Sequence, residues 1–174
     1  MRHAFIGLCM LGAACSGQSL SPTSPSGLAG MPGAQTQASG GDPVEVTFTK
    51  WGTGLPVPTH TGFAGGDVPG TFAGTVLSRD AFDNGTVVKL EARYEVTATD
   101  PAHSFVALIE GTLNNPTQKA VLNGTVTSGW LAGAQVQVTF DVIVPSAGTS
   151  CVPQAPVNRT CFQGTIRVMP GSAS

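Results

Sequence analysis

The sequence predicts an all-β domain in which a single antiparallel meander closes into a small barrel. Three observations predict it. Apolar and polar side chains alternate with a period of two over much of residues 42–170. Short connections rich in Asn, Asp, Gly and Pro separate these segments, and a five-residue pattern containing Gly-Thr recurs inside them. A two-layer β-sandwich is the alternative architecture, and about 130 residues suffice for one core of either kind.

Seven strands are expected, and the alternation is clearest in two of them, residues 86–99 and 134–144. In the first, Val, Leu, Ala and Tyr occupy one face while Lys, Glu, Arg and Thr occupy the other, as in a half-buried antiparallel strand. The seven predicted strands are residues 44–49, 71–77, 86–99, 104–113, 120–128, 134–144 and 161–168.

Turn chemistry supports these boundaries. Asp83-Asn84-Gly85 precedes the third expected strand, and Asn-Gly is a favoured hairpin dipeptide. Asp100-Pro101-Ala102-His103 and Asn114-Asn115-Pro116-Thr117 mark two further tight connections. A long Gly/Pro-rich connection is expected between Trp51 and Gly70.

The recurring pattern is a large apolar residue, any residue, Gly, Thr and a β-branched residue. It occupies residues 72–76, 122–126 and 162–166, each inside an expected strand. Glycine weakens a strand unless it permits a bend or a close approach. Inward glycines at the corners of a strongly curved sheet serve this purpose, which favours the barrel over the sandwich.

Residues 1–14 have the three parts of a bacterial signal peptide: Arg2, a short apolar run and small residues before Cys15. The segment from Leu11 to Cys15 resembles a lipoprotein lipobox, although Gly12 stands where the family has Leu, Val or Ile. The resemblance implies that Cys15 is lipidated and anchors an exported protein. Ser16, rather than Asp, implies outer-membrane sorting, with the domain facing either the periplasm or the surface. The alternative is a secreted protein cut near Ala14.

Composition divides the remainder into a linker at 15–41, a β domain at 42–170 and a flexible tail at 171–174. Residues 16–41 are rich in Gly, Ser and Pro and have no charged side chain, which is typical of a disordered tether. Without Arg2 the chain has seven Lys/Arg against ten Asp/Glu, a net charge of −3. This mild acidity argues against a nucleic-acid partner.

The lipoprotein interpretation also assigns a role to each of the four cysteines. Cys9 leaves with the leader and Cys15 takes the lipid, so Cys151 and Cys161 remain. In an oxidising compartment this pair predicts a disulfide. No metal and no cofactor are expected.

Five residues are candidate ligand contacts: Trp51, His60, Phe63, Asp67 and Trp130. The first four lie in the long connection, and long structured loops often carry function. In the alternative interpretation this connection folds over one barrel end, and Trp51 and Phe63 plug the core. Trp130 is expected to cap a hairpin or the barrel mouth.

No catalytic residues are predicted, and a non-enzymatic role is expected. His103 and Ser104 are adjacent in sequence and would point to opposite faces of a strand, which disfavours a hydrolase triad. Glu110 and Asp141 are possible paired carboxylates, but both fall on the polar faces of their strands.

The sequence therefore predicts a non-catalytic binding or structural protein at the bacterial envelope, with an envelope protein as a possible partner. The alternative is a barrel that binds a small apolar ligand or acts as a cyclase or isomerase. The meander with its Phe-x-Gly strands loosely resembles allene oxide cyclase and dirigent barrels, a likeness that transfers no site residues. An interior filled by Tyr94, Phe105, Phe140 and Phe162 favours the first hypothesis, and a void lined by them favours the second. The oligomeric state is not predicted.

Overall fold

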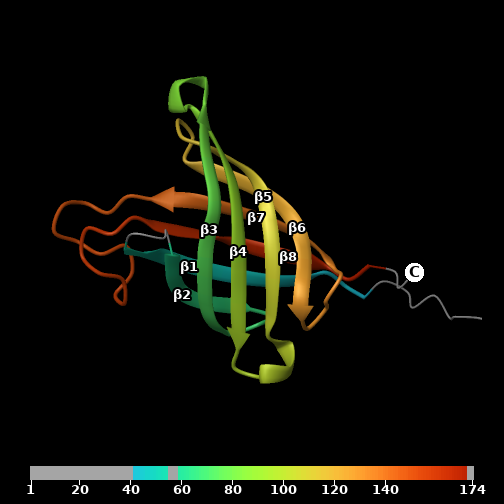
Figure 1. Cartoon of the computed structure of the whole chain (residues 1–174). Helices are drawn as coiled ribbons and strands as arrows, with labels where there is room; N and C mark the ends of the chain where they lie inside the picture. Colours follow the sequence, from blue (N-terminus) through green and yellow to red (C-terminus); the bar gives the residue numbers. More distant parts are fainter. Residues whose placement is uncertain (1–40, 55–58, 172–174) are drawn as a thin grey trace, which may run out of the picture. The chain divides into compact units, whose positions relative to one another are not determined.

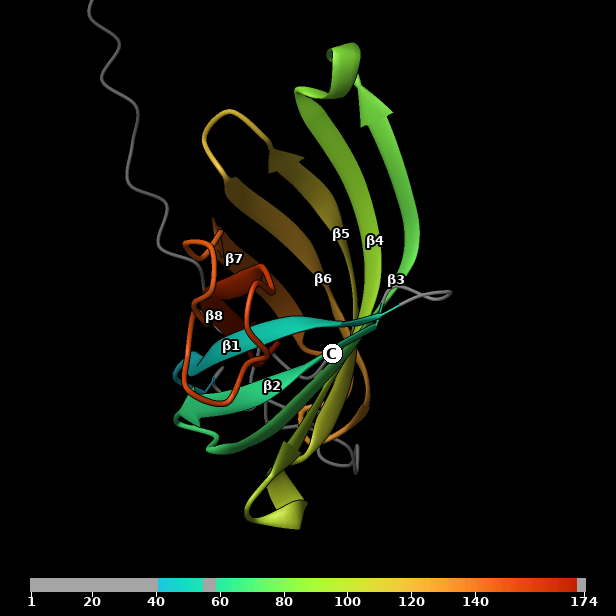
Figure 2. The same cartoon turned by 90° about the vertical axis from the view of Figure 1, so that its left-hand side faces the viewer.

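The computed structural model describes residues 41–54 and 59–171. They form a closed antiparallel barrel in which each strand pairs with the next and the last pairs with the first (Figures 1 and 2). The strands are β1 (Val44–Gly54), β2 (Thr59–Gly66), β3 (Gly70–Phe82), β4 (Val87–Ala98), β5 (Phe105–Asn114), β6 (Lys119–Gly129), β7 (Gln135–Ile143) and β8 (Cys161–Met169). The predicted all-β meander and barrel closure are confirmed. The leader, Cys15, the linker up to residue 40 and residues 172–174 lie outside the described residues.

The barrel has eight strands, so the prediction of seven was wrong. The additional strand is β2, which occupies part of the expected connection after Trp51 and pairs with both β1 and β3. Its inward positions carry His60, Gly62 and Ala64, which are small or polar. This composition hides the alternation that identifies the other strands, and β2 is held by backbone pairing on both edges.

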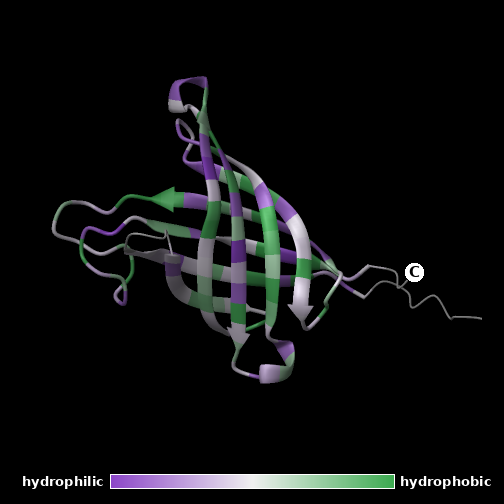
Figure 3. Ribbon diagram, in the orientation of Figure 1, coloured by the Kyte–Doolittle hydropathy of each residue, from purple (hydrophilic) through white to green (hydrophobic). Residues whose placement is uncertain are grey.

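Apolar side chains fill the interior of the barrel, as the alternation predicts. Along β4 and β7 every second residue is buried or half-buried, and most of the residues between them are exposed. The hydropathy of the strands alternates in the same way (Figure 3). The core side chains that are almost fully buried include Phe72, Ile109, Leu122, Ile166, Val46, Val96, Val138 and Val168. The core therefore draws on β1 and on β3 to β8, and β2 contributes Ala64.

The glycines of the recurring pattern allow neighbouring strands to approach closely. A Cβ on Gly164 would overlap the carbonyl oxygen of Thr139, and one on Gly124 would overlap that of Leu108. A Cβ on Gly74 would lie 3.1 Å from Phe72 Cε1. Close backbone contact therefore requires glycine at positions 124 and 164, as expected for a tightly coiled barrel wall, whereas a Cβ on Gly74 would need a shift of the Phe72 ring.

The hairpin connecting β3 and β4 is the longest, and it extends beyond the barrel wall (Figure 1). It turns through η1 (Asp83–Gly85), where Asp83, Asn84 and Gly85 have φ values of 51°, 52° and 84°. Asn, Asp and Gly are the residues that adopt this backbone region most readily. A second short turn, η2 (Pro101–His103), connects β4 to β5. Within the described ranges, no helix is long and apolar enough to cross a membrane.

Candidate functional site

Lys50 is the feature of the barrel interior that its apolar composition does not explain. It follows Val46 and Phe48 on the inward face of β1, and only 3% of its surface is exposed. Among the described residues it is the one buried polar or charged residue. Lysine is almost never fully buried unless it is paired, so its surroundings need an explanation.

Five aromatic rings surround the Lys50 ammonium. The distances from Nζ to their centroids range from 4.0 Å for Tyr94 to 5.6 Å for Phe162. The other three are Phe48, Phe72 and Phe140, at 5.4, 5.4 and 4.9 Å. These five rings, which we call the aromatic cage, come from β1, β3, β4, β7 and β8. Cations are attracted to aromatic ring faces at such distances.

The rings of the aromatic cage also contact one another. Phe72 lies 4.8 Å from Tyr94 and 5.2 Å from Phe48, measured between ring centroids. Phe140 lies 5.6 Å from Phe162 and 6.4 Å from Phe48. Rings in mutual contact from five strands fill this cross-section of the barrel. Phe105, at the start of β5, is also buried, with 2% of its surface exposed.

Lys50 Nζ donates a hydrogen bond to the Tyr94 hydroxyl. Burial lowers the pKa of the Lys50 ammonium well below its usual value, because the charged form loses its hydration. Burial raises the pKa of Tyr94 for the same reason. The contact thus joins an amine biased toward its neutral form to a phenol that keeps its proton.

His60 lies beside the aromatic cage, on the inward face of β2. Its ring packs edge-on against Phe162 with 5.2 Å between the centroids. Burial, and secondly the charge of Lys50, lowers the pKa of His60 to about 4, so the imidazole is neutral at pH 7. Its Nδ1 atom is buried and has no hydrogen-bond partner among the described residues.

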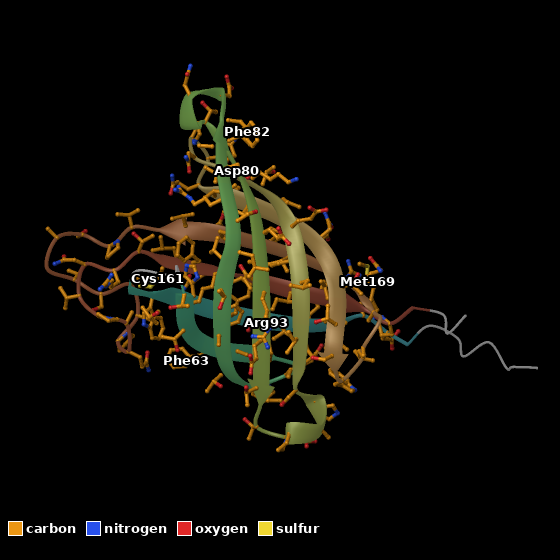
Figure 4. The ribbon with its side chains drawn as sticks, in the orientation of Figure 1. Phe63, Asp80, Phe82, Arg93, Cys161 and Met169 are labelled. Carbon is orange, nitrogen blue, oxygen red and sulfur yellow. A yellow bond between two sulfur atoms is a disulfide. The ribbon has the colours of Figure 1, made fainter. Side chains whose placement is uncertain are left out.

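The other predicted contacts do not join this group. Trp51 follows Lys50 and therefore points outward, where it is covered by Ala155 and Cys161. Phe63 packs against it at 5.3 Å and also faces outward (Figure 4). The expectation that Trp51 and Phe63 plug the core was wrong, because the parity of their strands places both outside the wall.

Asp67 and Trp130 lie away from Lys50. Asp67 accepts a hydrogen bond of 2.8 Å from the backbone N–H of Glu45, at the opposite end of β1. Trp130 follows β6, packs partly buried against the core, and contacts the His103 ring at 4.5 Å between centroids. Of the five predicted contacts, His60 alone reaches the lysine environment.

The side chains considered for hydrolysis are engaged elsewhere. His103 Nδ1 lies 3.1 Å from Asp100 Oδ2, while the Ser104 hydroxyl accepts a 3.0 Å hydrogen bond from the backbone N–H of Ala98. Glu110 Oε2 and Asp141 Oδ1 face Lys89 and Lys119 at 3.9 and 2.6 Å, as exposed ion pairs. Neither group has the relay that nucleophilic catalysis requires.

Cys151 and Cys161 lie at disulfide distance, with 6.2 Å between their Cα atoms. They connect the two ends of the segment between β7 and β8. Ala155 and Val152 of this segment pack against Trp51. This pairing fastens a small second hydrophobic cluster to the outside of the barrel, at the end where Lys50 lies.

The described part of the outer wall includes a larger and a smaller hollow. The larger, of about 830 Å³, crosses β4, β5 and β6 and is lined by Phe82, Leu108, Lys89, Glu110 and Thr125, among others. The smaller, of about 340 Å³, lies over β6, β7 and β8. Phe82 and Leu108 are 54% and 41% exposed. Phe82 stands near the tip of the β3–β4 hairpin (Figure 4).

Comparison with known protein families, curated proteins and solved structures finds no match to this chain. The site therefore rests on its own geometry. Sequence reasoning missed Lys50 because the first strand was expected to end at Thr49, one residue earlier. The available signal was the continued alternation of Val46, Phe48 and Lys50, which places a lysine on an apolar face.

Proposed function

We propose that this protein is an exported, lipid-anchored β-barrel with a non-catalytic binding or structural role at the bacterial envelope. The observation that carries the non-catalytic role is the filled interior. Tyr94, Phe105 and Phe140 are at most 5% exposed, and the aromatic cage leaves its cross-section packed. The lipobox-like residues from Leu11 to Cys15 support the anchor.

A packed interior leaves the outer wall as the surface available for recognition. Apolar side chains are exposed there on β3, β5 and β6, at Leu77, Phe82, Leu108 and Val121. Two of them line the larger hollow beside Lys89 and Glu110. A concave surface with apolar side chains and charges of both signs suits a protein partner better than a lipid tail.

The mass of the mature protein tests the anchor. Expression in a bacterial host should give an N-terminal peptide beginning at Cys15 and carrying a diacylglyceryl thioether, and Cys15→Ser should abolish this modification and membrane association. An unmodified N-terminus in the native chain would overturn the anchoring.

Site-specific photocrosslinking in intact cells tests the binding role. A photoreactive residue at Leu108, in the larger hollow, should capture an envelope protein. The matched control is the same residue at Arg167, an exposed position on β8. Equal crosslinking at both positions, or none at Leu108, would count against recognition by the larger hollow.

The alternative function is a barrel that binds a small ligand or acts as an isomerase-like enzyme. The inward polar groups of Lys50, Tyr94 and His60 favour it. A thermal-shift screen of small apolar compounds distinguishes the two functions. A compound that raises the melting temperature of the native barrel, but not of a Lys50→Met variant, would favour the alternative.

A further inference from the structure

We propose that Lys50 is a nucleophilic amine that forms an imine with a small aliphatic aldehyde inside the barrel. The position is defined by Lys50 Nζ, the Tyr94 hydroxyl and the unpartnered Nδ1 of His60. This activity goes beyond the proposed binding or structural role, which does not depend on it.

The surroundings of Lys50 differ from those of a structural lysine. A buried ammonium is normally retained by a carboxylate, but no described carboxylate forms an ion pair with Lys50. Its contacts are a phenol and the faces of aromatic rings. Desolvation among such neutral groups favours the free amine, which is the nucleophilic form.

Tyr94 is placed to move protons during imine formation. The Lys50 amine attacks the carbonyl carbon, and the C–N bond forms as the carbonyl π electrons pass to oxygen. That oxygen takes a proton from the Tyr94 hydroxyl, and the nitrogen returns one to the phenolate, giving a neutral carbinolamine. Protonation of its hydroxyl by Tyr94 then breaks the C–O bond, releases water and forms the iminium. Return of the iminium proton to Tyr94 leaves an imine, so that amine and aldehyde give imine and water.

His60 supplies a third polar group beside Lys50 and Tyr94. Its imidazole is neutral at pH 7, and the unpartnered Nδ1 can hydrogen-bond the carbonyl oxygen or the released water. An unsatisfied buried polar atom is destabilising, so a ligand that forms a hydrogen bond with it is favoured. His60 therefore orients the ligand and does not react with it.

The packing restricts both the route and the size of the aldehyde. His60 and Phe162 are only partly buried, whereas Lys50 is almost fully enclosed, so the approach runs past these two rings. The aromatic cage has ring contacts of 4.8 to 6.4 Å around the amine. Entry therefore requires displacement of these rings, and an aldehyde of a few carbon atoms requires less of it than an aromatic aldehyde.

Reductive trapping tests the proposal, with the other lysines of the chain as internal controls. Lys89 and Lys119 are exposed, with side chains 54% and 67% accessible. The folded protein is incubated at pH 7 with propanal and cyanoborohydride, and propylation of each lysine is followed by peptide mass spectrometry. We expect Lys50 to react at least about tenfold faster than Lys89, because burial lowers the pKa of Lys50, and each pH unit of lowering enlarges its free-amine fraction at pH 7 about tenfold.

Three comparisons separate nucleophilic reactivity from simple exposure. Benzaldehyde should not label Lys50, and urea-unfolded protein should lose the preference for Lys50. Tyr94→Phe should slow labelling of Lys50 and leave Lys119 unchanged. If Lys50 stays unmodified while Lys89 and Lys119 react, or reacts no faster than they do, the proposal is overturned.

Discussion

The hydrogen bond between Lys50 and Tyr94 should be measurable as a coupling energy in a double-mutant cycle. Tyr94→Phe removes one hydroxyl and keeps the ring that packs 4.8 Å from Phe72 and 6.0 Å from Phe48. The Lys50 nitrogen then has no hydrogen-bond partner among the described side chains. Leaving a buried polar atom without its partner costs about 1–3 kcal/mol, and we expect Tyr94→Phe to lower the unfolding free energy by about that amount.

Lys50→Met keeps a chain of similar length and removes the amine. It leaves the Tyr94 hydroxyl buried without its partner, which costs about 1–3 kcal/mol, but it also removes the desolvation penalty of the lysine. Thioether contacts with the aromatic cage add about 0.3–1.5 kcal/mol of stabilisation. We therefore expect a change within about 1.5 kcal/mol of zero.

The double variant lacks both polar groups, and replacing both partners by apolar groups is often neutral or stabilising. It should be about as stable as the native protein, so that with Lys50→Met near zero the coupling energy is about 1–3 kcal/mol. Urea unfolding at pH 7, followed by circular dichroism with the disulfide intact, measures all four proteins. Additivity within about 0.5 kcal/mol would refute the interaction.

Three further predictions concern pH, the barrel wall and the disulfide. His60 has a folded pKa of about 4 against 6.5 in the unfolded chain, so the native state binds fewer protons between these values and should lose up to roughly 3 kcal/mol of stability as the pH falls from 6.5 to 4. His60→Gln should remove most of this loss of unfolding free energy between pH 6.5 and 4, measured by urea unfolding at each pH. Lys50→Met should raise the His60 pKa measured by NMR, because the lysine charge contributes to the shift. An unchanged pH dependence of stability and an unchanged His60 pKa would contradict this. Gly164→Ala should destabilise the barrel by at least about 2 kcal/mol because the added methyl overlaps the Thr139 carbonyl. The control Gly171→Ala, whose added methyl has nothing within 4 Å, should change stability by less than about 0.5 kcal/mol in the same urea assay. Equal effects of the two substitutions would disprove the close approach of the strands at Gly164. Replacing Cys151 and Cys161 together by Ser should cost about 2–3 kcal/mol through loss of the loop constraint, measured as a lower melting temperature, and no shift on reduction of the native protein would show that the pair is not bonded.

Local pattern in the sequence was sufficient for most of the wall. The alternation through β4 and β7 and the turn at Asp83-Asn84-Gly85 were predicted correctly, because side-chain parity and turn chemistry depend on adjacent residues. The inward glycines were also anticipated. Strand β2 was missed because His60, Gly62 and Ala64 give no apolar periodicity.

The candidate site could be predicted only in part. His60 was recognised as a candidate contact, but Lys50 was not, because the strand was expected to end at Thr49. In the alternative interpretation Trp51 and Phe63 plug the core, but strand parity places both outside the barrel, since a shift of one residue exchanges the two faces of a strand.

The sequence by itself determined the alternating strands, their turns and the glycines at which they approach. Only the tertiary structure decided that β1 pairs with β8 to close a barrel and that Lys50, Tyr94 and His60 meet inside it. The physical reason is that alternation fixes which face a side chain occupies, whereas the pairing register between distant strands fixes its neighbours across the core.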